Sequence, residues 1–232
     1  MNKLCYTKCY NQTMKYFVFS LDDGTIWDVD TIVLFNKYGF KATFNLNSEL
    51  QDFVWYLDDL PIRRLKLEEA KHLYDGHEIA SHTLTHPYLD SIDDGRLIYE
   101  IDHDIENLEN IFQREVRSFA VPFTVCGDRE IYLISNHTKA TNIRLDQLDT
   151  SFSLPSDPYH IKVTAFEINK ALSLFDEFVK DPNAKLFVYA GHSYDFYVAN
   201  TFDKLEELLI KISSHKEDIK VVTMSEMVKE LL

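Results

Sequence analysis

Short apolar segments alternate with segments of helical periodicity along most of this chain. Segments 15–21 (KYFVFSL) and 185–191 (KLFVYAG) contain few polar positions, which is typical of strands buried on both faces. In segment 96–112, apolar residues at 98, 101, 105, 108 and 111 recur every three or four positions, which predicts a long amphipathic helix.

The same reading over the whole chain predicts about seven repeats of a strand followed by a helix. Strands are expected at 15–21, 41–47, 78–81, 116–121, 141–145, 185–191 and 219–223. Helices are expected at 30–38, 67–74, 96–112, 129–139, 165–179, 202–213 and from 225 onward. This alternation predicts an α/β fold with a parallel sheet and external helices. Seven units favour a closed or nearly closed barrel, in a single domain 15–232 after an N-terminal extension 1–14.

Composition narrows the classes of partner. The 232 residues carry a formal net charge of −14, which disfavours nucleic acid as a partner. No apolar segment is long enough to span a membrane or to act as a secretory leader, so we expect a cytoplasmic protein. Cys5, Cys9 and Cys126 are expected to be ordinary thiols. Aromatic residues make up 13% of the chain, which fits a ring-rich core or, alternatively, a ring-lined sugar groove.

Several polar residues directly follow predicted strands. Asp22 and Asp23 follow the first strand, His82 and His86 follow the third, and His192 follows the strand at 185–191. Functional residues of parallel α/β barrels lie at the carboxyl ends of the strands, so these side chains are expected to meet at one mouth.

Each of these motifs is ambiguous when taken alone. Asp22-Asp23-Gly24 is also a common turn sequence. His82 and His86 are four residues apart, as in some zinc sites, but the glutamate of the H-E-x-x-H protease motif is absent. Two histidines and one carboxylate nevertheless form a known three-ligand metal set that leaves positions open for water.

The ordered motifs SLDDG, KATFNLN, GHEIASHTLTH, FAVPF and YAGHSYDF resemble those of the polysaccharide deacetylases, carbohydrate esterase family four. The resemblance extends over about 15–223 and is greatest to a short branch with a GHSYDF-like late motif. It implies a distorted (β/α)₇ barrel, TIM-like, with metal-dependent deacetylase activity on carbon–nitrogen bonds. The implied substrate is an acetylated amino sugar or glycoconjugate, with N-acetyl favoured over O-acetyl.

The resemblance also implies roles for individual residues. Asp22 would be the general base and His192 the general acid. Asp23, His82 and His86 would bind a divalent metal. We expect Zn²⁺, with Co²⁺, Ni²⁺ and Mn²⁺ as alternatives.

On the substrate side, the resemblance places Pro122 in the groove and a backbone N–H near Phe123 at the oxyanion. Asp195, which lies close to His192 in the sequence, is also expected among these substrate-side residues. Many family members carry an arginine in the proline motif that pairs with the base aspartate, whereas this chain has Ala120 at that position. We hypothesise that Arg144, on the predicted fifth strand, provides that pairing instead.

Two alternatives remain open at this point. The same scaffold could hydrolyse a non-sugar amide or a cyclic imide, or the chain could be a non-catalytic carbohydrate-binding relative. Catalysis is favoured because the base, the acid and the three metal ligands are all present in the sequence. Since no leader segment is evident, a cytoplasmic glycoconjugate precursor is expected in preference to a cell-wall polymer.

Overall fold

The computed structural model of the protein describes residues 14–232. Cys5, Cys9 and the predicted extension 1–14, except for Met14, therefore lie outside the described residues. No helix within 14–232 combines the length and apolar character needed to cross a bilayer.

A sheet of eight strands forms the centre of the molecule, and all its strand pairs are parallel. The order β9-β1-β2-β5-β6-β7-β8 runs around most of a barrel, and an isolated parallel bridge from Ala165 to Tyr189 links the segment after β8 to β9. β10 pairs with the first half of β1, at Lys15–Phe17, and β2 pairs with the second half, at Ser20–Asp22. The predicted distorted (β/α) barrel is therefore confirmed. The strands are β1 (Lys15–Asp22), β2 (Thr43–Leu46), β5 (Glu78–Ser81), β6 (Ser118–Ala120), β7 (Asn142–Leu148), β8 (Ile161–Val163), β9 (Leu186–His192) and β10 (Ile219–Val221).

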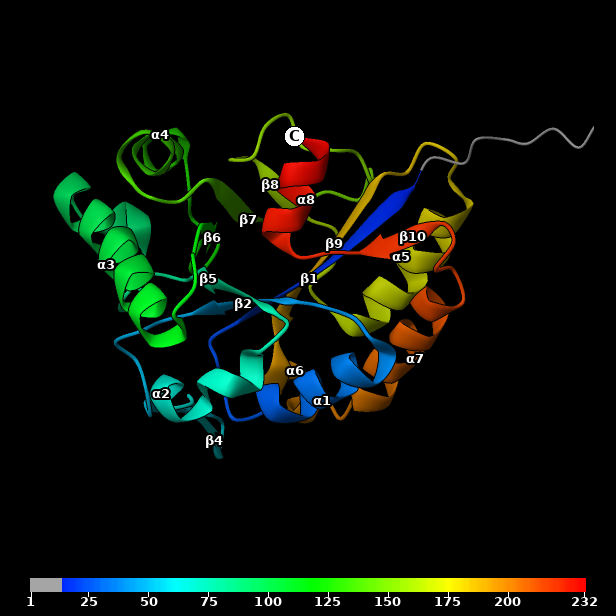
Figure 1. Cartoon of the computed structure of the whole chain (residues 1–232), viewed down its shortest axis with the longest axis horizontal. Coiled ribbons are helices and arrows are strands. Elements are labelled where there is room, and N and C mark those ends of the chain that lie inside the picture. The colour runs from blue at the N-terminus through cyan, green and yellow to red at the C-terminus, as the bar shows by residue number, and fades with distance from the viewer. Residues whose placement is uncertain (1–13) are drawn as a thin grey trace, which may run out of the picture.

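Helices surround this sheet, with α3 and α4 on one side and α5 and α7 on the other (Figure 1). Each covers the sheet with its apolar face, as the buried positions of α3 and α7 show. The α-helices are α1 (Asp28–Tyr38), α2 (Leu67–Ala70), α3 (Asp94–Phe112), α4 (Asp128–His137), α5 (Ile168–Lys180), α6 (Ser193–Val198), α7 (Phe202–Ser213) and α8 (Met224–Leu231), and the 3₁₀ turns are η1 (Lys71–Tyr74) and η2 (Leu89–Ser91).

The apolar strands predicted at 15–21 and 185–191 are neighbours in the sheet. Phe17 and Phe187 are fully buried, and their rings stack with centroids 4.6 Å apart. Because β1 and β9 pair over seven consecutive residues, the ends of both strands lie at the same level, with Asp22 opposite His192. This register brings the first and last predicted motifs together.

Several elements of the structure were not predicted, among them the 3₁₀ turn η2. An antiparallel hairpin of β3 (Val54–Leu57) and β4 (Leu60–Arg63) lies between β2 and α2. The short strand β8 precedes the bridge to β9, and α6 follows β9 directly. In addition, the single helix predicted at 67–74 is divided into α2 and η1. The hairpin matters most for function because it supplies one wall of the site described below.

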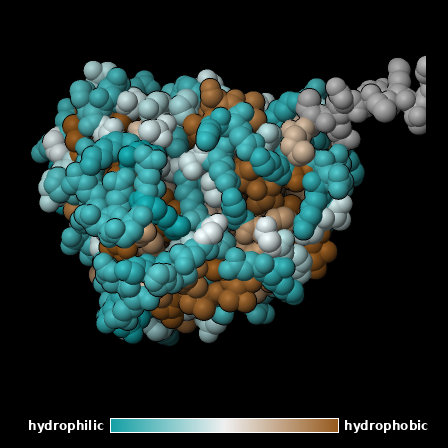
Figure 2. Space-filling view, in the orientation of Figure 1, coloured by the Kyte–Doolittle hydropathy of each residue, from teal (hydrophilic) through white to brown (hydrophobic). Residues whose placement is uncertain are grey.

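The molecular face in Figure 2 is mostly hydrophilic and is interrupted by hydrophobic patches, such as the one over α1. Val29 and Val33 of α1 are exposed apolar residues. Isolated patches of this kind are normal on soluble domains.

Candidate active site and metal centre

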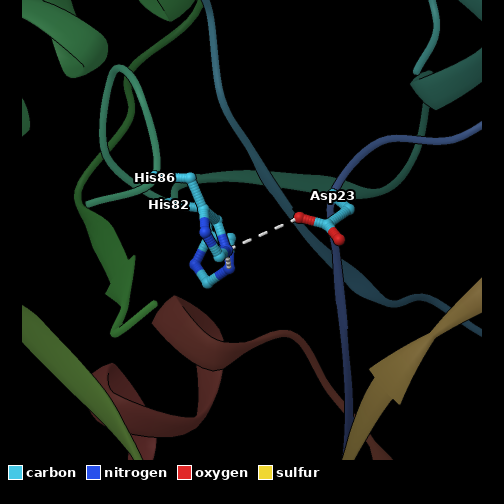
Figure 3. Close-up of side chains that lie close together, drawn as sticks. All are labelled: Asp23, His82 and His86. Carbon is cyan, nitrogen blue, oxygen red and sulfur yellow. Dashed lines mark hydrogen bonds and ion pairs between the residues drawn. The ribbon is translucent and has the colours of Figure 1, made fainter. Parts of the chain in front are cut away.

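Asp23, His82 and His86 converge at the carboxyl ends of the strands. Asp23 directly follows β1, His82 directly follows β5, and His86 lies in the loop after it. One potential ligand atom from each residue lies within 4.8 Å of the others. Figure 3 shows both imidazoles pointing toward the Asp23 carboxylate, with His86 Nε2 3.8 Å from Asp23 Oδ1.

The spacing of the two imidazoles fits a shared metal ion. Their Nε2 atoms lie 3.2 Å apart. Two nitrogens at ~2.0–2.1 Å from a tetrahedral zinc ion would be separated by about 3.3 Å. Two imidazole nitrogens and one carboxylate oxygen are also a donor set that leaves open positions for water. The residues present therefore fit a divalent transition metal.

Both ligand histidines are held in the neutral form that binds metals. The carbonyl oxygen of Ala120 lies 2.9 Å from His82 Nδ1 and accepts its proton, which leaves the Nε2 lone pair free. Burial lowers the pKa of His82 to about 3, although the nearby Asp22 carboxylate opposes the shift. Burial also lowers the pKa of His86. Protons therefore do not compete with a metal for these nitrogens at neutral pH.

Left-handed backbone conformations are concentrated at this mouth. Asp23 has φ 81°, Thr83 has φ 68°, His86 has φ 56° and Phe123 has φ 58°. Such conformations are uncommon for residues other than glycine and are often found at functional sites. Gly24 also has φ 63°, and a Cβ there would lie 2.7 Å from a methyl carbon of Leu46, so only glycine fits directly after Asp23.

Buried side chains fix the loop that carries the two histidines. Glu100 of α3 accepts hydrogen bonds from the Thr85 backbone N–H at 2.8 Å and from its hydroxyl at 2.7 Å. Asn47 donates to the carbonyl oxygens of His82 and Thr83. The loop is therefore fastened from α3 and from the end of β2.

Asp22 is an ionised carboxylate held by a buried arginine. Arg144 donates to Asp22 Oδ1 at 3.0 Å and to Oδ2 at 2.7 Å, and Asn45 donates to Oδ1 at 2.6 Å. Burial alone would raise the pKa of Asp22, but Arg144, with His82 and His192, outweighs it and lowers the pKa to about 2. Asp22 is thus available at neutral pH to accept a proton.

The arginine that holds Asp22 comes from the strand next to the one where the family pattern places it. In the β6–β7 register, Arg144 is the direct partner of Ala120. Paired residues on adjacent parallel strands point to the same face of the sheet. Arg144 therefore presents its guanidinium from beside the position of the missing motif arginine.

His192 has the opposite protonation state to the ligand histidines. Its Nδ1 lies 2.9 Å from Asp195 Oδ2, and its Nε2 lies 3.7 Å from Asp23 Oδ2. Burial would lower its pKa, but the Asp195 hydrogen bond and the Asp23 charge outweigh this and raise the pKa to about 9. His192 is therefore an imidazolium at neutral pH and can donate a proton.

Two charged residues of the site were not predicted. Arg64, directly after β4, is buried and donates to the Asp23 carbonyl at 2.8 Å, to Asp23 Oδ1 at 2.7 Å and to Asn47. Asp146 of β7 lies 2.9 Å from Arg144, and burial raises its pKa to about 6 despite that cation. No local sequence motif marks either residue. The partner of Arg64 is distant in the chain, whereas Asp146 pairs with the nearby Arg144 on the same strand.

A cavity of about 510 Å³ joins these groups. Of the predicted site residues, it is lined by Asp22, Asp23, His82, His86, His192 and Phe123. Arg144 lies beneath Asp22. Pro122 and Asp195 are not on the lining, and Asp195 instead faces a neighbouring cavity beside α5 and α6. The lining also includes Leu50, Phe53, Trp55, Arg64, Thr85, Asp146 and Tyr194, none of which was predicted.

Comparison with protein families identifies the chain. The polysaccharide deacetylase family model matches residues 10–143, which is more than half of the sequence. The chain belongs to the polysaccharide deacetylase family. The predicted resemblance is therefore confirmed, although the matched range ends before the late motif at His192. No curated protein sequence matches the chain.

Solved structures share this fold over nearly the whole chain. The Xyl-CE4 domain of a multidomain xylanase, from the hindgut metagenome of Trinervitermes trinervoides, is 16% identical with a TM-score of 0.63, over 94% of this chain and 91% of that one. A family 4 acetyl xylan esterase from Clostridium thermocellum, in complex with a cobalt ion, is 14% identical with a TM-score of 0.60, over 93% and 91%.

The fold also includes members that are not active enzymes. The wild-type BA3943 protein from Bacillus anthracis, described as a CE4 family pseudoenzyme, is 16% identical with a TM-score of 0.59, over 94% of this chain and 66% of that one. Identities this low establish the fold alone, so function has to be argued from the site of this chain.

Proposed function

We propose that this protein is a metal-dependent deacetylase that removes an acetyl group from an amino sugar or glycoconjugate, with N-acetyl favoured over O-acetyl. The observation that carries the proposal is the convergence of Asp22, His192 and the Asp23–His82–His86 ligand set on one cavity. An ionised carboxylate and an imidazolium flank a complete three-ligand set. Pairs of groups whose pKa values are driven apart are typical of acid–base sites.

Asp23, His82 and His86 would hold the ion, for which we propose Zn²⁺, with Co²⁺, Ni²⁺ and Mn²⁺ as alternatives. A bound divalent ion supplies Lewis-acid activation of water and of the acetyl carbonyl. Its ligand histidines are neutral and oriented, and Ala120 fixes the tautomer of His82.

The chain's own residues then handle the protons. Asp22, oriented by Arg144, accepts the proton of the water that attacks the acetyl carbon. The Phe123 backbone N–H donates to no other residue within 14–232, and it is available to the developing oxyanion. His192 donates its proton to the departing amine, and Asp195 stabilises the imidazolium form beforehand. Acetate and the free amine leave the cavity.

The test combines metal analysis with acetate release from a panel of N-acetylated and O-acetylated sugars. Asp22→Asn should keep stoichiometric metal and lose about 10²–10⁴ in kcat, because only the proton acceptor is removed. His82→Ala should lose both metal and activity. If Asp22→Asn is as active as the wild type, the proposed role of Asp22 is wrong.

The same panel separates the competing functions. A metal-loaded protein that releases no acetate but hydrolyses a cyclic imide or a simple amide would be an amidohydrolase on this scaffold. A protein that binds sugars and hydrolyses nothing would be a binding relative, as the existence of pseudoenzymes with this fold allows.

A further inference from the structure

A second cavity, of about 370 Å³, lies between the start of α5 and α6. It shares no lining residue with the cavity of the candidate active site. Asp195 connects the two, because it lines the second cavity and its Oδ2 accepts a hydrogen bond from the His192 backbone N–H at 2.9 Å. No residue on the lining carries a positive charge. The apolar lining residues are Phe166, Ile168, Phe196, Val198 and Ala199.

Tyr189 of β9 lines this cavity, and its hydroxyl has no hydrogen-bond partner within residues 14–232. The side chain is only 1% exposed. Its ring packs between Phe19 and Phe196, with centroids 6.0 Å from each, so the position of the hydroxyl is fixed. Buried tyrosine hydroxyls usually have a hydrogen-bond partner. The Tyr189 hydroxyl is therefore available to a molecule that enters the cavity.

Two further oxygen atoms lie near this hydroxyl, around Gly191. A Cβ on Gly191 would lie 3.3 Å from the Phe166 carbonyl oxygen, 3.4 Å from Asp195 Oδ2 and 3.5 Å from the Tyr189 hydroxyl oxygen. In the described part of the chain, the Phe166 carbonyl accepts no backbone hydrogen bond. Because glycine has no side chain, the space between the three oxygens is not filled, and each of the three can accept a hydrogen bond.

The charges around the cavity are negative. Asp195 and Glu167 both line it. Burial raises the pKa of the Tyr189 hydroxyl, and both carboxylates raise it further, so their field reaches that oxygen. An anion in the cavity would be repelled, and a wholly apolar molecule would leave the hydroxyl and the Phe166 carbonyl without partners. The aromatic rings on the lining also favour a cation, because ring faces attract positive charge.

We propose that this cavity binds a small organic cation that consists of a primary ammonium group on an apolar body. A primary ammonium has three N–H donors and no acceptor, which matches the three oxygens around Gly191. The apolar body would pack against Phe196 and Val198. The bound ammonium would share the Asp195 carboxylate with His192. This site is distinct from the metal centre, and the inference does not depend on the proposed function.

The experiment is a calorimetric titration at neutral pH with benzylammonium, and with benzyl alcohol as its uncharged counterpart. The wild type should bind benzylammonium about ten-fold or more tightly than benzyl alcohol. Tyr189→Phe keeps the ring and removes one acceptor, so it should weaken benzylammonium binding about ten-fold, as expected for a hydrogen bond to a charged group. Glu167→Gln should weaken it about two- to five-fold. The matched control is Glu177→Gln, at an exposed position of α5 away from the cavity, which should bind like the wild type.

Added Zn²⁺ separates this cavity from the candidate metal centre. A benzylammonium ion bound at Asp23 would compete with Zn²⁺, whereas binding beside Tyr189 should persist when Zn²⁺ is in excess. Because the titration measures binding, a wild type that releases no acetate leaves this test intact. The inference is overturned if the wild type does not bind benzylammonium, if benzyl alcohol binds as tightly, if Zn²⁺ abolishes the binding, or if Tyr189→Phe binds like the wild type.

Discussion

Arg144 donates hydrogen bonds to both carboxylate oxygens of Asp22, and it lies directly opposite Ala120 in the β6–β7 register. We expect Arg144→Ala to lower kcat by about 10²-fold or more, because the base loses its orientation and its low pKa. The variant leaves Asp22 and Asp146 without their shared cation, so its thermal stability must be measured beside its activity. Full activity in a folded Arg144→Ala protein would contradict the role of Arg144.

The register of the two strands offers a second test of this pairing. The double variant Arg144→Ala with Ala120→Arg moves the guanidinium to the adjacent strand while leaving it on the same face. We expect kcat to recover by about ten-fold or more over Arg144→Ala alone. Ala120→Arg in the wild-type background is the matched control, since it adds a second buried cation and should not raise activity.

Arg64 pairs with Asp23 at the position where a metal would also bind this carboxylate. Arg64→Met should lower the melting temperature of the metal-free protein, because it leaves Asp23 buried without a counter-charge. Added metal should then raise the melting temperature more than it does in the wild type. Arg63→Met is the control, because Arg63 is exposed and pairs with Asp52 at the surface. Equal metal-induced rises in wild type and Arg64→Met would contradict this account.

Removing the metal should destabilise the fold. An ion that binds only the folded state contributes about 4 kcal/mol when its concentration is ~1,000 times Kd. For a domain of this size, we expect chelation to lower the melting temperature by about 8–16 °C. His82→Ala, which lacks a ligand, should show no response to chelator. A chelator-insensitive wild type would show that Asp23, His82 and His86 do not hold a stabilising ion.

The carboxyl of Asp28 should make stability depend on pH. It is fully buried and accepts a hydrogen bond from the Tyr74 hydroxyl at 2.7 Å. Burial raises its pKa from 3.8 to about 7. The pKa of Asp28 is higher in the folded state than in the unfolded state. The contribution of Asp28 to the free energy of unfolding is therefore fully present below about pH 4 and is lost as pH rises through about 7.

Asp28→Asn tests this dependence because it keeps an acceptor for Tyr74 and cannot ionise. Between pH 4 and pH 8, the wild type should lose up to about 4 kcal/mol of unfolding free energy relative to Asp28→Asn. Urea unfolding at several pH values measures this difference. Asp30→Asn, at an exposed position of the same helix, should follow the wild-type curve. Parallel curves for wild type and Asp28→Asn would refute the prediction.

The sequence predicted the ends of strands well and the contacts between distant segments poorly. Asp22, His82 and His192 follow apolar strands, so their common location could be derived from barrel geometry alone. Arg64 is 41 residues from Asp23, and the hairpin that delivers it has only four residues in each strand. Strands this short, with mostly exposed side chains, leave no clear periodic pattern.

The absence of the motif arginine at Ala120 illustrates a related limit. A pattern search at that position would judge the base to be unsupported. In the structure, Arg144 of β7 provides a guanidinium in place of the motif arginine. It can do so because Arg144 lies opposite Ala120 in a strand register that the sequence does not specify. In a parallel sheet, a functional group can therefore move to an adjacent strand and keep its place in space.

The left-handed residues at the mouth of the barrel have a kinetic consequence. Asp23 and His86 hold uncommon backbone angles, and hydrogen bonds from Arg64 to the Asp23 carbonyl and from Asn47 to the Thr83 carbonyl fix that geometry. The ligands are therefore arranged before a metal arrives, and no loop has to order around it. Metal uptake by this protein should accordingly be fast and follow a single exponential, limited by the loss of water from the ion.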